Sequence, residues 1–274
     1  MALTDALQIV SITDPGRVRG HNEDCVESRP DLGIVVLADG MGGYNAGEVA
    51  SGMATSLIAS GLQEVWTKDV LKKLDRDAAM SLSQRLIQEQ VAKANRAIYD
   101  AAQKDPHCAG MGTTLVACVF YDNFLTVGHI GDSRLYRMRS DVLEQVTRDH
   151  SLLQEQIDSG LITKEDARSS HNKNLVTRAV GIDPEVEAEI HSYDVQKDDI
   201  FLLCSDGLND MIEDEEIQMT LIALRSNLDL TAQQLIQAAN DAGGRDNVSV
   251  MLVRIQKEFG VERGFWATVK SWFS

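Results

Sequence analysis

The chain has 274 residues, 43% of them hydrophobic, which is enough apolar material for a substantial buried core. Its 26 basic and 42 acidic residues give a formal net charge of −16, so nucleic-acid phosphates are repelled and we expect no nucleic-acid partner. The four cysteines show neither CxxC nor zinc-ligand spacing, which argues against a disulfide framework and favours a reducing compartment.

Targeting and membrane segments are not evident in the sequence. Residues Met1–Thr13 carry one acid and no basic residue, unlike a signal peptide, and no apolar run approaches the length of a membrane span. We therefore expect a cytoplasmic monomer without integral membrane association. Because no flexible linker interrupts the chain, residues 7–256 are predicted to form one domain.

Residues 257–274 are predicted to form an amphipathic helical extension. We expect this extension to dock on its own domain, with contact to a membrane or a partner as the alternative. Aromatic residues recur along it at helical spacing: Phe265, Trp266, Trp272 and Phe273.

A buried strand that runs into an acidic turn is the first strong signal along the chain. Leu7–Thr13 alternates like a strand, and the polar cluster that follows it through Asp24 is by itself only a surface loop. Ile34–Ala38 is a continuous apolar run, typical of a strand buried on both faces, and it leads directly into Asp39 and Gly40. A charge so close to an apolar core needs a cation or another partner.

Helices and short strands follow. Gly47–Val65 and Asp77–Gln103 have helical spacing and are expected to cover a sheet. Short turns then separate strands that pair as antiparallel hairpins, namely Thr113–Phe120, Phe124–Ile130, Ser133–Met138 and Val142–Val146. The remaining predicted elements are a helix over Leu152–Ser159, a strand over Val186–His191, a strand over Ile200–Cys204, helices over Glu213–Leu224 and Thr231–Ala242, with Thr231 as an N-cap, and a strand over Val248–Ile255.

Two further acids lie at strand ends. Asp206 follows Ile200–Cys204, and Asp246 precedes Val248–Ile255. In an antiparallel arrangement the start of one strand and the end of another meet at the same edge, so Asp39, Asp206 and Asp246 are expected to converge. The whole pattern predicts an α+β fold with two packed central antiparallel β-sheets, a β-sandwich, flanked by pairs of α-helices.

Acidic residues beside glycines or in turns suggest a metal site. Clustered carboxylates raise one another's pKa, whereas Mg²⁺ or Mn²⁺ keeps them ionised, and an oxygen-only ligand set favours these ions over zinc. For Asp132, ordinary turn chemistry is the alternative. Neither GxxxxGK[ST] nor GxGxxG occurs around Gly40, which excludes a P-loop. The acids are Glu23, Asp24, Asp39, Asp132, Asp206 and Asp246.

These acids belong to an ordered set of short motifs that resembles the metal-dependent (PPM, or type-2C) serine/threonine protein phosphatases in their bacterial form. Each motif is weak alone, but their order is specific, and the likeness spans about Leu7 to Ile255. The motifs are Arg19…Asn22-Glu23-Asp24, Ala38-Asp39-Gly40-Met41-Gly42-Gly43, Met111-Gly112-Thr113-Thr114, Gly131-Asp132-Ser133-Arg134, Thr147-Arg148-Asp149-His150, Ser205-Asp206-Gly207 and Gly244-Arg245-Asp246-Asn247.

The resemblance implies a two-metal phosphatase centre that holds Mn²⁺ or Mg²⁺. Asp39 would bridge both ions, and the Gly40 carbonyl would bind the second. Asp206 and Asp246 would complete the shell of the first ion. A water activated by the two ions would then attack phosphorus in line, without a phosphoenzyme.

The resemblance also implies supporting roles. Glu23 and Asp24 would hold the second ion through water, and Asp132 would help to bind a third, weaker ion that shares Asp206. Arg19 would grip the substrate phosphate, with Arg17 as the competing arginine. Arg19, Asp39 and Asp206 are therefore the predicted catalytic residues.

Some positions leave alternatives open. Many eukaryotic members of the family carry a histidine general acid where this chain has Met41, so another group or water must protonate the leaving alkoxide. The polar segment 169–174 is expected to form a flap, with Asn172 in place of the family's usual proline. His129 and His150 are expected to be packed, hydrogen-bonded histidines rather than catalysts.

The leading hypothesis is hydrolysis of phosphoserine and phosphothreonine on proteins, in bacterial signalling opposite a cognate Ser/Thr kinase or acting on that kinase's substrates. One alternative is a catalytically silent module that binds phosphoproteins. The other is a metal phosphoesterase for small molecules or phosphohistidine.

Overall fold

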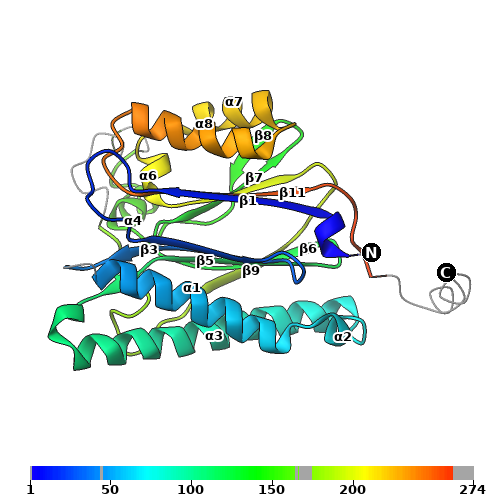
Figure 1. The fold of residues 1–274 in the computed structure, drawn as a ribbon, viewed down its shortest axis with the longest axis horizontal. Coiled ribbons are helices and arrows are strands. Elements are labelled where there is room, and N and C mark those ends of the chain that lie inside the picture. Colours follow the sequence, from blue (N-terminus) through cyan, green and yellow to red (C-terminus); the bar gives the residue numbers. More distant parts are fainter. Residues whose placement is uncertain (1, 44–45, 164–165, 167–174, 262–274) are drawn as a thin grey trace, which may run out of the picture.

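Two antiparallel sheets lie face to face in the middle of the molecule, and helices cover their outer faces (Figure 1). The computed structural model describes residues 2–43, 46–163, 166 and 175–261. The polar segment 169–174 and residues 262–274 of the extension, which include Phe265, Trp266, Trp272 and Phe273, lie outside the described residues. Within the described residues, the predicted α+β sandwich is confirmed.

The first sheet has five strands in the order β1-β11-β10-β7-β8, and all neighbouring strands are antiparallel. The first and last strands of the chain therefore pair with each other, from Leu7 with Ile255 to Asp14 with Val248. The strands are β1 (Leu7–Asp14), β11 (Val248–Ile255), β10 (Ile200–Cys204), β7 (Arg134–Arg139) and β8 (Val142–Gln145).

The second sheet follows the order β2-β3-β5-β6-β9, again antiparallel, with a short strand β4 paired to the end of β3. Its central strands carry the continuous apolar runs that the sequence shows, because both of their faces are buried. The strands are β2 (Asp24–Arg29), β3 (Ile34–Met41), β4 (Gly112–Thr113), β5 (Leu115–Tyr121), β6 (Phe124–Ile130) and β9 (Glu189–Asp194).

Each sheet has its own pair of long helices. In Figure 1, α1 (Ala46–Val65) and α3 (Arg76–Lys104) lie under the second sheet, and α7 (Asp214–Leu224) and α8 (Leu228–Asp241) lie over the first. The described shorter helices are η1 (Leu3–Asp5), α2 (Lys68–Leu71), η2 (Pro106–Cys108), α4 (Leu152–Asp158) and α6 (Asp206–Asn209).

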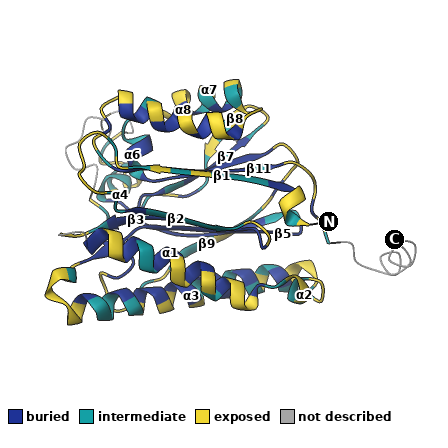
Figure 2. Ribbon diagram, viewed as in Figure 1, coloured by how far each residue is buried: buried dark blue, intermediate teal, exposed yellow. Residues whose placement is uncertain are grey.

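Three apolar layers hold these elements together: one between the two sheets and one between each sheet and its pair of helices. Figure 2 shows the buried residues concentrated where sheets and helices face one another. Along β3 the side chains alternate between layers: Val35 and Leu37 face the other sheet, while Val36 packs with the helix side. Phe120 of β5 meets Phe201 of β10 edge to face between the two sheets, with ring centroids 5.4 Å apart. The sheets therefore form a rigid frame for the residues at their ends.

Some element boundaries differ from the sequence prediction. No strand was predicted over Asp24–Arg29, yet this segment is β2, and the strand expected over Val186–His191 is β9, which begins at Glu189. The prediction that Thr231 is an N-cap is wrong: α8 begins at Leu228, and Asn227 Oδ1 accepts the Leu230 N–H. Thr231 lies inside the helix, where its hydroxyl donates to backbone carbonyls.

The layer between the sheets generates a stability prediction. Leu203 on β10 is 0% exposed in this layer, so Leu203→Ala removes buried methyl groups and leaves a cavity. We expect the free energy of unfolding to fall by about 2–5 kcal/mol in urea denaturation. Leu161→Ala is the matched control, because that side chain is 75% exposed; it should cost less than about 0.5 kcal/mol. Equal losses in the two variants would contradict this packing.

Candidate metal centre

The acids singled out by sequence gather at the end of the sandwich where α4 and α6 lie (left in Figure 1). Asp39 sits near the end of β3 and is the register partner of Asp24, the first residue of β2. Asp206 follows β10 as the first residue of α6, and Asp246 precedes β11. The predicted convergence of Asp39, Asp206 and Asp246 agrees with the mutual charge repulsion found among them.

Hydroxyl groups of the neighbouring strands fix the backbone around Asp39. Thr114 Oγ1 accepts the Asp39 N–H at 3.0 Å, and the Thr114 N–H donates to the Asp39 carbonyl at 2.8 Å. Thr113 Oγ1 donates to the same carbonyl at 2.8 Å. Thr113 and Thr114, where β4 meets β5, therefore fix the backbone that carries the Asp39 carboxyl.

Glycine is required next to Asp39 because α1 approaches β3 closely. A Cβ on Gly40 would overlap the carbonyl oxygen of Gly47, and its N–H donates to the Glu23 carbonyl at 3.0 Å. A Cβ on Gly47 would in turn lie 2.7 Å from Glu23 Oε1. The Glu23 carboxylate is thereby placed against the first turn of α1, where a backbone N–H of Gly47 bonds to it.

Asp24 is buried, with 7% of its surface exposed. Its Oδ2 accepts the Ser205 hydroxyl at 2.7 Å, and Ser205 Oγ itself accepts the Ser249 N–H at 2.9 Å. Its Oδ1 is buried without a hydrogen-bond donor among the residues that the structure describes. An orphaned carboxylate oxygen of this kind fits a bound cation or an ordered water.

Arg19 and Asn247 organise the opposite side of the cluster. Arg19 Nη2 is 2.7 Å from Asp246 Oδ2, and the arginine side chain remains 52% exposed. Asn247 Oδ1 accepts the Glu23 N–H at 2.8 Å, and its Nδ2 donates to the carbonyls of His21 and Pro15 at 2.8 and 3.0 Å. One asparagine thus ties the loop before β2 to the start of β11.

Asp132 lies in the turn between β6 and β7. Ser133 Oγ is 2.7 Å from Thr114 Oγ1, so this turn and Asp39 share one threonine. Burial raises the pKa of Asp132 to about 7. Asp132 and Asp206 also line a polar cavity of about 190 Å³ that opens beside the cluster.

The pKa values of the central acids show that the bare cluster is electrostatically unfavourable. Burial raises the pKa of Asp39 and of Asp206 well above the ordinary value, and each is raised further by the neighbouring carboxylates. Burial likewise raises the pKa of Asp24 to about 6. Divalent cations with a preference for oxygen ligands fit these donors, because they restore the ionised form of every carboxylate.

The structure therefore brings together every predicted site residue, from Arg19 to Asp246. Sequence reasoning missed the partners that orient them: Thr114, Ser205 and Asn247. All three lie inside the short motifs given above. A polar residue within a motif that has no assigned role could therefore have been predicted to orient a neighbouring acid.

An acidic cluster of this kind, at the end of a two-sheet sandwich, fits a divalent-metal centre. The family model of protein phosphatase 2C matches residues 21–248. Serine/threonine phosphatase stp of Listeria innocua is 40% identical over 244 residues, which cover 88% of this chain and 93% of that protein.

Solved structures agree with this sequence similarity. The crystal structure of the Mycobacterium tuberculosis serine/threonine phosphatase PstP/Ppp aligns with a TM-score of 0.81 at 35% identity, covering 92% of this chain and 100% of that one. The catalytic domain of PstP in complex with two manganese ions gives a TM-score of 0.79 at 35% identity, covering 92% and 99%.

The chain belongs to the protein phosphatase 2C family. It is a metal-dependent protein serine/threonine phosphatase that uses Mn²⁺ or Mg²⁺, and its substrates are phosphoproteins. Among the described residues, no helix is both long and apolar enough to cross a membrane.

The raised pKa values generate a prediction about pH and metal. Without metal, the folded chain holds protons on Asp24 and Asp132 that the unfolded chain releases near pH 3.8. The stability contributed by these groups is therefore lost as pH rises from about 4 to about 7. Mn²⁺ replaces those protons, so we expect the rise in melting temperature caused by Mn²⁺ over EDTA to be larger at pH 8 than at pH 5.

Thermal unfolding at the two pH values, with and without Mn²⁺, tests this expectation. At each pH, the melting temperature in EDTA is subtracted from that in Mn²⁺. This subtraction removes the contribution of groups whose titration does not depend on the metal. Asp39→Asn and Asp206→Asn should remove most of the Mn²⁺-induced rise. A rise of the same size at pH 5 and pH 8, or one retained in both variants, would contradict the assignment of these carboxyls to the metal.

Proposed function

We propose that this centre hydrolyses phosphoserine and phosphothreonine on proteins with the residues that the sequence analysis selected. Asp39 would serve both ions, Asp206 and Asp246 the first, and the Gly40 carbonyl the second. Divalent ions held there would make water more acidic and offset charge on the transferring phosphoryl group. The observation that supports these roles most strongly is the burial of Asp39 and Asp206 among other carboxylates.

The outer acids complete the proposal. Glu23 and Asp24 would hold the second ion through water, and Asp132 would help to hold a third, weaker ion together with Asp206. The orphaned Oδ1 of Asp24 supports its role, because a buried acceptor without a donor is left for water or a cation. The polar cavity beside Asp132 and Asp206 supports the third position.

Arg19 is proposed to bind the substrate phosphate. Its guanidinium lies beside the acids, paired with Asp246, and half of it remains exposed to a ligand. Arg17 is exposed as well, but among the described residues it forms no ion pair with any of the acids, whereas Arg19 pairs with Asp246. Arg19 therefore fits the role better than Arg17. Because Met41 has no proton to donate, we propose that water protonates the leaving alkoxide.

We further propose that the enzyme acts in the cytoplasm as a monomer, opposite a Ser/Thr kinase or on that kinase's substrates. The relatives named as bacterial serine/threonine phosphatases support this setting. We also propose that residues 7–256 form the phosphatase domain and residues 257–274 an extension docked on it. The Phe259 N–H donates to Asn123 Oδ1 at 2.6 Å and its side chain is buried, at the opposite end of β5 from the acids.

The direct test is release of phosphate from a phosphothreonine peptide in Mn²⁺, Mg²⁺ and EDTA, beside Asp206→Asn. We expect turnover in either metal, none in EDTA, and a loss in the variant that added metal does not restore. Binding of the peptide by folded protein without turnover in any metal would favour a silent binding module. Turnover of small phosphate esters but of no phosphopeptide would favour a small-molecule phosphoesterase.

The role of Arg19 has its own test. A hydrogen bond to a charged group contributes about 1.5–3 kcal/mol, so Arg19→Ala should lower kcat/KM for the phosphopeptide by roughly 10- to 100-fold. Arg17→Ala is the matched control and should change kcat/KM by less than about threefold, since Arg17 is not proposed to bind the phosphate and no charged hydrogen bond is lost. A larger loss of kcat/KM in Arg17→Ala than in Arg19→Ala would show that Arg17, not Arg19, binds the phosphate.

A further inference from the structure

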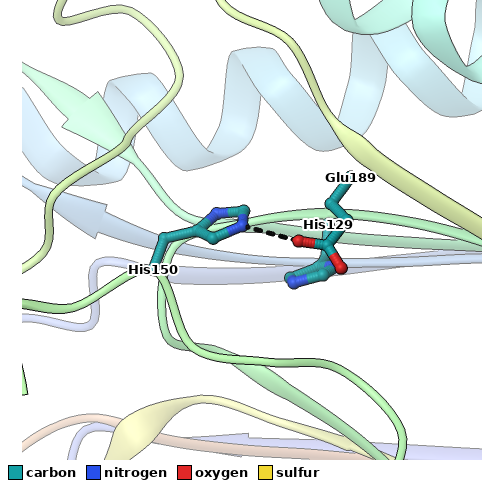
Figure 3. A group of neighbouring side chains, drawn as sticks. All are labelled: His129, His150 and Glu189. Atoms are coloured by element: carbon teal, nitrogen blue, oxygen red, sulfur yellow. Dashed lines mark hydrogen bonds and ion pairs between the residues drawn. The ribbon is translucent and has the colours of Figure 1, made fainter. Parts of the chain in front are cut away.

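Three titratable side chains meet beside the metal centre without belonging to it. His129 of β6 and Glu189 of β9 are register partners, and His150 reaches them from the segment between β8 and α4 (Figure 3). Their nearest ligand-type atoms all lie within 4.8 Å of one another. His129 is 1% exposed and His150 is 7% exposed, so both rings are shielded from water, whereas the Glu189 side chain is 34% exposed.

The hydrogen-bond partners assign the protons on both rings. The Gly131 N–H donates to His150 Nδ1 at 3.2 Å, so the His150 proton is on Nε2, which donates to Glu189 Oε2 at 3.3 Å. His129 Nε2 must donate to the Arg148 carbonyl at 2.9 Å, because a carbonyl only accepts. Burial lowers the pKa of both imidazoles, because it disfavours the charged form of each ring.

These bonds argue against His150 as a metal ligand, whereas the Nδ1 of His129 is buried with no hydrogen-bond partner among the described residues. The Nδ1 lone pair of His150 is already used by Gly131, and its Nε2 carries a proton. The two rings are stacked with centroids 4.8 Å apart and planes 16° apart. Ring lone pairs lie in the ring plane, so lone pairs of two stacked, nearly parallel rings do not converge on one ion.

The same bonds hold the turn that carries Asp132. His150 makes two hydrogen bonds with Gly131. Its ring Nδ1 accepts the Gly131 N–H, and its backbone N–H donates to the Gly131 carbonyl at 2.9 Å. Gly131 has a φ of +96°, and a Cβ there would lie 2.7 Å from the Thr114 side chain, so this position requires glycine. Asp132 is the next residue along the chain.

A parallel set of contacts fixes the other side of the turn. The Arg134 guanidinium donates to both carboxylate oxygens of Asp149, from Nε at 3.0 and 3.1 Å and from Nη2 at 2.8 Å. The Leu135 N–H donates to Thr147 Oγ1 at 2.9 Å. Segment 147–150 therefore lies along segment 131–135. Within this pairing, His150 contacts Gly131, the residue before Asp132.

We propose that His150 is a positioning residue for the metal centre: Glu189 holds its Nε2–H tautomer, and its Nδ1 fixes the Gly131 peptide and with it the Asp132 carboxyl. This inference rests on the proposed role of Asp132 in holding the third ion. Outer-shell partners of this kind change metal affinity or activity by about 10- to 100-fold when they are removed.

The test measures the Mn²⁺ concentration for half-maximal activity, with kcat and KM for the phosphopeptide, in the full chain. His150→Gln keeps a donor for Glu189 but loses the Nδ1 acceptor, so we expect a roughly 10-fold higher Mn²⁺ requirement with KM little changed. His150→Asn keeps an oxygen acceptor near the position of Nδ1 and should lie between that variant and the wild type. His107→Gln, on an exposed histidine, is the matched control.

Glu189 provides an independent arm if His150→Gln fails to fold. Glu189→Leu removes the acceptor for His150 Nε2–H and should shift the Mn²⁺ requirement in the same direction. Glu189→Gln keeps an acceptor oxygen and should restore nearly the wild-type value. A merely structural role would lower the melting temperature of these variants without moving their Mn²⁺ requirement, and that result would overturn the proposal.

Asp132→Asn separates this inference from the proposed function. A higher Mn²⁺ requirement in Asp132→Asn together with a wild-type requirement in His150→Gln overturns the positioning role alone. A wild-type requirement in Asp132→Asn overturns the role of Asp132 and the inference with it. Stoichiometric Zn²⁺ binding that is lost in His129→Gln would also overturn it, because the group would then be a metal site.

Discussion

Burying several carboxylates against one another at the end of an apolar sandwich is the constraint on which the rest of the structure depends. Each of Asp24, Asp39 and Asp206 is disfavoured as an anion by burial, and their neighbours increase the cost. A folded chain can tolerate this only with protons or cations on the cluster. The metal dependence of the enzyme thus follows from where the fold places its acids.

The two sheets make that placement possible. Antiparallel pairing puts the end of β3, the start of β2, the end of β10 and the start of β11 at one edge. The three apolar layers fix the frame, and polar side chains at its edge then orient the acids: Thr114 holds the Asp39 backbone, Ser205 holds Asp24, and Asn247 holds Glu23. Rigid elements with a supporting shell of hydrogen bonds keep such a site in a defined geometry.

Much of this arrangement could be predicted from sequence, and particular residues show why. Ile34–Ala38 and Ile200–Cys204 are apolar throughout because their strands are buried on both faces, and the acid after each run marks the sheet edge. β2 was missed because it is an edge strand of mostly half-buried, mixed side chains and has no apolar run. The order of the short motifs carried the site residues and the family.

The orienting contacts were beyond sequence reasoning for a physical reason. Ser205 and Asp24 are 181 residues apart, and Glu23 and Asn247 are 224 apart, so no local pattern links them. His150 was expected to be a structural hydrogen-bonding histidine and His129 a packed and satisfied one. The structure shows the hydrogen bonds of His150, but the buried Nδ1 of His129 has no hydrogen-bond partner among the described residues. Their link to the Asp132 turn depends on the pairing of segment 147–150 with segment 131–135, which emerges only in the fold.

If the buried carboxylates are the ligands of the catalytic ions, Mn²⁺ should bind among them. The most direct measurement is anomalous diffraction at the manganese edge from crystals grown with Mn²⁺. We expect two strong peaks, one near Asp39, Asp206 and Asp246 and the other near Asp39 and the Gly40 carbonyl, with a weaker peak beside Asp132. No peak at Asp39, or the strongest peak at His129, His150 and Glu189, would contradict this assignment.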